Sequence, residues 1–200
     1  MGHVSAHDDL NILDKIAYAG VTGGTTGRAG QMNRFAAGMG LTSQGIPFLH
    51  EGDEFLHSKV VGGDYEAAKN SYESGDNVNA TQWSEKTLNA ATFRYYKDAI
   101  ALRKNTPALR LGTWDAVKAQ MATSVNGSVV TSAISPHADA PTTHHTVVVY
   151  NPTHNPRERG PARRYVEEGP RHQRRHRLHQ HHRRRTRRHR LQEALIARTP

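Results

Sequence analysis

The chain changes character near residue 157, and this change limits how much of it can form a hydrophobic core. Residues 157–200 contain 15 Arg and no Lys and carry a net charge of +11, whereas residues 1–156 carry −2 of the total of +9. A segment so poor in apolar side chains cannot bury enough surface to offset the entropy lost on folding. We therefore expect a folded part within residues 1–153 and a disordered basic tail over residues 154–200.

Three interpretations of the tail stay open. It could be a selected basic arm that binds phosphate backbones, and the protein would then bind nucleic acid. It could be a metal-binding tract around His179, His181 and His182. It could also be translated out of frame from GC-rich DNA, which accounts best for the abrupt change and for the absence of Lys. In each case we expect the tail to bind polyanions non-specifically at low salt.

The composition excludes some classes of site and leaves the compartment undecided. The chain has no Cys, which rules out disulfides and thiolate metal sites. No apolar run approaches the roughly 20 residues of a membrane-spanning helix, so we expect no membrane association. The N-terminus lacks the charged and apolar regions of a secretion signal.

Hydrophobic periodicity predicts helices in the first part of the folded region. Residues 10–16 predict one or two helical turns, and the Gly-rich residues 20–30 predict a loop. The next helix is expected to end at a cap formed by Gly45. Its predicted buried face shows the i, i+3, i+4, i+7 spacing and consists of Met32, Phe35, Ala36 and Met39.

A short strand and a long loop follow. Residues 46–49 predict the strand, and residues 50–84 a loop without regular structure, a length that usually indicates function. Residues 85–105 predict one long helix with Ser84 as N-cap and a stop at Thr106-Pro107. Its expected buried side chains are Leu88, Ala91, Tyr95, Ala99 and Leu102.

The last folded segment has the pattern of an antiparallel β-sheet. Three runs rich in β-branched residues, at 113–121, 128–134 and 146–150, predict strands. Asn126-Gly127 between the first two is a hairpin-turn signal.

Five sequence blocks in this chain resemble one family. They are HVSAHDD, QMNRFAAGMGLTSQGIPFLHEGDEF, NSYESGD, VNATQWS and YYKDAIALRKNTPALRL, which follow one another between residues 3 and 111. They resemble the C-terminal third of pullulanase-type α-1,6-glucosidases, debranching enzymes of glycoside hydrolase family 13, the α-amylase family. The resemblance covers roughly residues 2–151 and is strongest over residues 31–111. The resemblance implies an α/β fold: residues 1–111 would be the last two β/α units of a (β/α)₈ TIM barrel. Residues 112–153 would begin an all-β C-terminal domain of β-sandwich type.

The resemblance also implies roles for individual residues. Asp8 would be the carboxylate that stabilises an oxocarbenium-like transition state, and His7 would contact the same glucose unit. Asp9 stands where the family often has Asn, which bears on the orientation of Asp8. The glucan-binding loop would contain Asn70, Tyr72 and Asp76.

The implied activity is hydrolysis of α-1,6 branch linkages in pullulan, starch or glycogen, with retention of configuration. The family places its nucleophile and general acid on earlier strands, which are not among these 200 residues. We therefore expect a fragment that is inactive alone, with its true N-terminus missing and a secreted parent. An alternative from another class is a carbohydrate-binding or interaction module that uses residues 50–84.

Other site hypotheses are weaker. The GGTTG segment around Gly23 resembles a phosphate cradle but lacks the Lys of a P-loop. No cofactor is evident, although the parent enzyme could bind Ca²⁺. Asp53, Glu54 and Asp76 have no EF-hand spacing, and we expect them to be solvated loop acids. Trp83 could stack on sugars.

Overall fold

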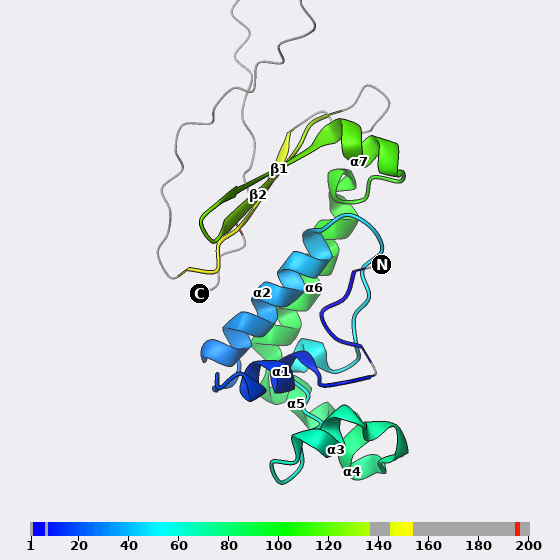
Figure 1. The fold of residues 1–200 in the computed structure, drawn as a ribbon, viewed down its shortest axis with the longest axis vertical. Helices are drawn as coiled ribbons and strands as arrows, with labels where there is room; N and C mark the ends of the chain where they lie inside the picture. The colour runs from blue at the N-terminus through cyan, green and yellow to red at the C-terminus, as the bar shows by residue number, and fades with distance from the viewer. Residues whose placement is uncertain (1, 7, 137–144, 154–194, 197–200) are drawn as a thin grey trace, which may run out of the picture.

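The structure, a computed structural model, describes residues 2–6, 8–136 and 145–153 and the backbone of residues 195–196. Two long helices lie side by side, with a small β-sheet near one end and several short helices near the other (Figure 1). This mixture of helices and strands confirms the α/β class. The elements are α1 (Ile12–Tyr18), α2 (Arg28–Thr42), η1 (Asp53–Phe55), α3 (Tyr65–Lys69), η2 (Ser71–Glu73), α4 (Asp76–Asn79), α5 (Trp83–Leu88), α6 (Ala90–Asn105), η3 (Pro107–Leu109), α7 (Trp114–Gln120), β1 (Met121–Asn126), β2 (Val129–Ile134), β3 (Thr146–Tyr150) and β4 (Leu195–Ile196).

The buried face of α2 differs from the predicted one. Met32 and Met39 are 37% and 38% exposed, while Phe35 and Ala36 are half-buried. The helix instead turns small and polar residues inwards, because α6 packs closely against it. A Cβ on Gly38 would lie 2.5 Å from the Tyr95 hydroxyl oxygen. The buried residues of α2 are Ala29, Gly30, Asn33, Arg34, Ala37, Gly38, Leu41 and Thr42.

Arg103, near the end of α6, holds the end of α2. Its guanidinium donates to the carbonyl oxygens of Leu41 at 2.8 Å, Ser43 at 2.7 Å and Gly45 at 2.5 Å. The Leu41 carbonyl is one that the helix end leaves without an intrahelical partner, and the Ser43 and Gly45 carbonyls belong to the turn that follows. The prediction of Gly45 as the cap is wrong, since α2 ends at Thr42 and is capped by Ser43.

The predicted strand at residues 46–49 is reduced to one parallel bridge with the N-terminal segment. The Gly2 N–H donates to the Ile46 carbonyl at 2.9 Å, and the Phe48 N–H donates to the Gly2 carbonyl at 2.8 Å. Among the described residues, the pairing between these two segments is limited to this one bridge. The two segments are joined in the sequence through α1 and α2.

The region between residues 50 and 105 is more helical than predicted. The expected loop contains η1, α3, η2 and α4 and the start of α5, and the expected single helix is divided at Asn89. Trp83 is already helical, so Ser84 is not the N-cap. Leu88 is 75% exposed and Ala91 is also exposed, whereas the predicted stop at Thr106-Pro107 is confirmed. The inward-facing residues of α6 are Thr92, Tyr96 and Arg103.

The sheet confirms two of the three predicted strands and the hairpin. Its order is β1-β2-β3-β4, with the first three strands antiparallel and β4 parallel to β3. Asn126 pairs with Val129, so the turn itself is Gly127-Ser128, with Gly127 at φ +59°. The strand predicted at 113–121 is wrong over α7, because the Thr113 hydroxyl accepts from the Ala116 N–H and caps a helix there.

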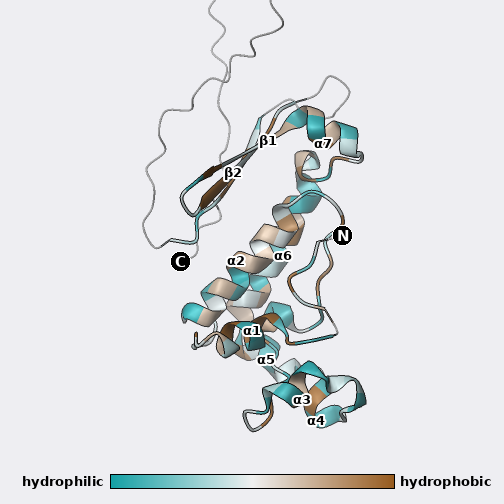
Figure 2. Cartoon of the chain, viewed as in Figure 1, coloured by the Kyte–Doolittle hydropathy of each residue, from teal (hydrophilic) through white to brown (hydrophobic). Residues whose placement is uncertain are grey.

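Two clusters of buried apolar side chains hold these elements together. The brown colour of hydrophobic residues is prominent on the sheet in Figure 2. One cluster joins the sheet to η3 and the ends of α2 and α6, and the Tyr150 hydroxyl lies 2.9 Å from the Thr42 hydroxyl across it. The other packs α1 against the start of α2. The buried members of the first are Ala108, Leu109, Ile134, Val148 and Tyr150, and those of the second are Ile12, Ile16 and Ala29.

We expect Arg103→Ala to lower the free energy of unfolding by about 2–4 kcal/mol, because three carbonyls lose a charged donor. Urea denaturation followed by tryptophan fluorescence measures this change. The matched control is Arg94→Ala, at an exposed position of the same helix, with an expected change within about 0.5 kcal/mol. Equal effects of the two substitutions would show that Arg103 does not hold the end of α2.

Candidate functional site

Asp8 lies on the surface at the end of the N-terminal segment. One of its carboxylate oxygens accepts a hydrogen bond from the Asp9 N–H at 3.0 Å. Asp9 has a φ of +65°, a left-handed conformation in which Asn and Asp are enriched among non-glycine residues. Asp can therefore stand where the resembling family often has Asn. His7 lies outside the described residues.

Lys59 links the Asp8-Asp9 turn to the segment of residues 70–76. Its ammonium donates to the Asp9 carbonyl at 2.6 Å and to the Ser71 hydroxyl at 3.1 Å. The side chain is buried, and burial lowers the pKa of its ammonium group. Its backbone N–H donates to a buried carboxylate oxygen of Asp14 at 2.9 Å, which fixes the lysine against α1. Two of the predicted site segments therefore lie within reach of one side chain.

The three residues predicted to bind glucan in the segment of residues 70–76 all lie on the surface. Tyr72 is 81% exposed in η2, Asn70 is the exposed residue that follows α3, and Asp76 begins α4. Backbone carbonyls of the segment are held by the Asn79 amide, which donates to Ser71 at 2.6 Å and to Ser74 at 2.8 Å. The loop is thus braced from inside while its polar side chains face solvent.

Asp53 is the buried centre beneath this surface. The Ser5 hydroxyl and the Ile12 N–H, at 3.3 Å for the latter, donate to its two carboxylate oxygens. Its backbone carbonyl accepts from the side-chain amide N–H of Asn33 at 3.2 Å, and the side-chain oxygen of Asn33 accepts from the Tyr96 hydroxyl at 3.0 Å. One residue therefore joins the N-terminal segment, α1, α2 and α6.

Burial raises the pKa of Asp53 to about 6, against the opposing effect of the Ser5 and Ile12 hydrogen bonds. The expectation that Asp53 is a solvated loop acid is wrong, since only 2% of it is exposed. Glu54 is half-buried and accepts from the Gly52 N–H at 2.9 Å, whereas Asp76 is exposed as expected.

Within the described parts of the chain, no three His, Asp or Glu side chains are grouped so that they could hold a metal ion. A groove of about 420 Å³ lies between residues 49–54 and α6, but none of the predicted site residues lines it. No helix of the described region is both long and apolar enough to cross a membrane. The candidate site is therefore the open surface around Asp8 and residues 70–76.

The known proteins similar to this chain in sequence and those similar to it in structure carry the same name, pullulanase. No protein-family model matches the chain. The pullulanase of Bacillus subtilis strain 168 is 32% identical over 111 residues, which are 56% of this chain and 14% of that protein. The solved pullulanase of Bacillus acidopullulyticus superposes with a TM-score of 0.58 at 32% identity, over 66% of this chain and 16% of that one. The Paenibacillus barengoltzii pullulanase, solved with maltohexaose and α-cyclodextrin, superposes with a TM-score of 0.58 at 34% identity, over 66% of this chain and 20% of that one.

These similarities relate the chain to the glycoside hydrolases. Within that class it is a pullulanase-type relative over about two thirds of its length. The chain spans between a seventh and a fifth of the relatives it matches.

The sequence alone did not single out the residues that support the site. The sequence predicts Asp53 only as an acid of a loop, and nothing in the spacing of GDEF indicates that its carboxylate accepts a hydrogen bond from Ser5, 48 positions earlier. No pattern in the sequence singles out Lys59. Its position between apolar pairs, Phe55-Leu56 before it and Val60-Val61 after it, is the one signal that could have indicated a buried cation.

The raised pKa of Asp53 predicts a specific pH dependence of stability. A carboxyl whose pKa is raised by folding stabilises the protein fully below the unfolded value of 3.8, and this contribution is lost as the pH rises to about 6. We expect Asp53→Asn to remove this component, which amounts to at most about 3 kcal/mol.

The measurement is urea denaturation of both proteins between pH 3.5 and 7. As the pH rises from 3.8 to about 6, the unfolding free energy of wild type should fall relative to that of Asp53→Asn. Above pH 6 the difference between the two proteins should stay constant. A difference that is independent of pH would contradict the assignment of a raised pKa to Asp53. Asp98→Asn, at an exposed position of α6, serves as the control.

Proposed function

We propose that this chain forms part of a pullulanase-type glycoside hydrolase that cleaves α-1,6 branch linkages in pullulan, starch or glycogen with retention of configuration. The observation that carries the proposal is the parallel pairing of Gly2 with the Ile46–Phe48 segment through two hydrogen bonds. Parallel strands joined by a helix end at the same edge, and (β/α)₈ enzymes hold their active sites there. Asp8 and the turn around Asp53 both follow such ends.

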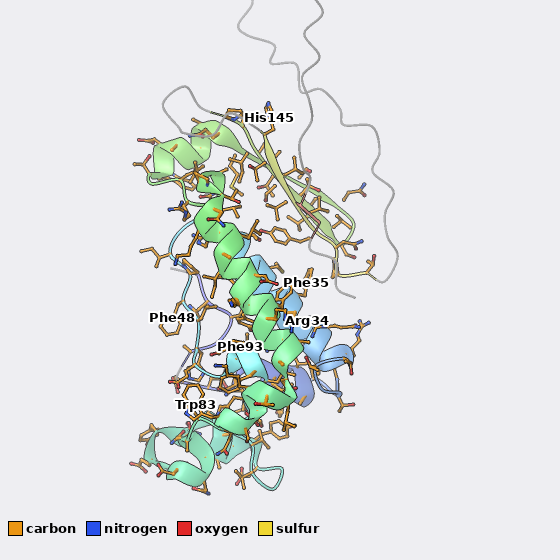
Figure 3. All side chains as sticks on the ribbon, turned by 180° about the vertical axis from the view of Figure 1, so that it is seen from behind. Arg34, Phe35, Phe48, Trp83, Phe93 and His145 are labelled. Carbon is orange, nitrogen blue, oxygen red and sulfur yellow. The ribbon has the colours of Figure 1, made fainter. Side chains whose placement is uncertain are left out.

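In this proposal residues 1–111 contribute the last two β/α units of a (β/α)₈ barrel. Residues 112–153 begin a β-domain, and residues 154–200 are the basic tail. The exposed apolar side chains beside the parallel bridge support the barrel assignment, since Ile46 is 69% and Phe48 38% exposed. Figure 3 shows Phe48, Phe93 and Trp83 along one side of the helix pair. Further strands of a barrel would cover this side.

Asp8 would act as the carboxylate that stabilises the transition state. Positive charge develops on the sugar ring as the glycosidic bond breaks, and a fixed negative charge stabilises that state more than the ground state. The hydrogen bond from the Asp9 N–H orients one carboxylate oxygen and leaves the side chain exposed to a ligand. His7, Asn70, Tyr72 and Asp76 would bind hydroxyl groups of the glucan around it.

Retaining hydrolysis also needs a nucleophile and a general acid about 5–5.5 Å apart. The resemblance assigns neither role to a residue of this sequence. We therefore expect the 200-residue chain alone to release no reducing ends from pullulan. Reducing ends released by the purified chain, and lost in Asp8→Asn, would contradict this expectation.

Retention on immobilised pullulan tests whether the chain binds glucan. We expect a chain that ends at Asn151 to be retarded at high salt, which suppresses binding through the basic tail. Asp8→Asn should weaken the retention severalfold, whereas Asp98→Asn should leave it unchanged. If the shortened chain passes through unretarded, the proposed glucan site does not exist in it. Salt-sensitive DNA binding that is lost with the tail would favour the nucleic-acid hypothesis instead.

A further inference from the structure

Tyr18, Tyr65 and Lys69 form an aromatic cluster on the surface between α1 and α3. The two rings lie 5.2 Å apart with an interplanar angle of 60°, and the Lys69 ammonium is 4.7 Å from the centre of the Tyr18 ring. Tyr18 is nevertheless 61% exposed. A tyrosine that is fixed by two neighbours and still open to solvent offers a rigid contact surface at little entropic cost.

The cluster lies next to the proposed glucose site. The Lys15 ammonium is 3.6 Å from a carboxylate oxygen of Asp9. The pKa of the Asp9 carboxyl is lowered mainly by a hydrogen bond from the Leu10 backbone, and the positive charges of Lys15 and Lys69 lower it further. Lys69 is also paired with Glu66 at 2.7 Å. Charged donors and acceptors thus continue from the Asp8-Asp9 turn to the edge of the two rings.

We propose that Tyr18 and Tyr65 form a glucan-stacking platform that binds a sugar unit beyond the one contacted by Asp8. This inference rests on the proposed function and adds a second contact to the same substrate. Ligand sites combine aromatic surface with a few polar groups that fix orientation. In the part of the chain that the structure describes, neither phenol hydroxyl has a protein hydrogen-bond partner, so both are available to sugar hydroxyls.

The surroundings favour a polyhydroxylated ligand over a protein partner. The core of a protein interface is depleted of charged residues, whereas this cluster is surrounded by Asp9, Lys15, Glu66 and Lys69. A glucan presents apolar C–H faces to the rings and hydroxyls to the surrounding charges. The Lys69 contact to Tyr18 supplies the orientation that a single exposed ring would lack.

Calorimetric titration of the full 200-residue chain with maltotetraose tests the platform. We expect Tyr18→Ala to weaken binding about tenfold, and Tyr18→Phe to stay within about twofold of wild type because the ring remains. The control is Trp114→Ala, at a 71% exposed aromatic position on α7, which should leave the affinity unchanged. In wild type, the NMR signals of the Tyr18 and Tyr65 rings should shift as the sugar is added.

One outcome would refute the platform alone, and another would refute the platform and the glucose site together. If Asp8→Asn weakens maltotetraose binding while Tyr18→Ala does not and the Tyr18 and Tyr65 signals stay in place, the platform is refuted and the glucose site stands. If wild type does not bind maltotetraose at millimolar concentration, both are refuted. The ring signals are measured on wild type, so they decide the question even if Tyr18→Ala unfolds.

Discussion

The arrangement of this chain depends on the buried carboxyl group of Asp53. It accepts from Ser5 and Ile12 through its side chain, and its backbone carbonyl accepts from Asn33. A buried carboxyl group is costly unless its hydrogen bonds are satisfied, so the three donors must come together when the chain folds. This requirement brings the N-terminal segment, α1 and α2 together around Asp53.

The candidate site follows from that meeting point. Once Ser5 is fixed, Asp8 lies a few residues beyond it at the surface, and Lys59, a few residues beyond Asp53, extends to the Asp9 carbonyl. The same lysine contacts Ser71 and so positions the loop that carries Tyr72. Buried Ser5 and Ser71 thus hold the backbone close to Asp8 and Tyr72, whose exposed side chains face the ligand in the proposed function.

Sequence reasoning predicted the elements whose signals are local. The stop at Thr106-Pro107, the helical turns predicted at residues 10–16 and the hairpin beside Gly127 depend on neighbouring residues, and the structure confirms them. Buried faces were predicted less well, because close helix packing at Gly38 replaces large apolar side chains with small and polar ones. The helix at Trp114–Gln120 was mistaken for a strand because its start depends on one cap, the Thr113 hydroxyl. The role of Asp53 depends on partners far away in sequence and has no local signal.

The central claim is that the Asp8-Asp9 turn and the loop of residues 70–76 form one glucan site. Backbone amide NMR of the chain during titration with maltotetraose tests it most directly. We predict that the Asp8, Asp9 and Tyr72 amide signals shift together and follow one binding curve, while signals of β1 and β2 stay in place. Shifts confined to one of the two segments, or separate binding curves for the two, would contradict the claim.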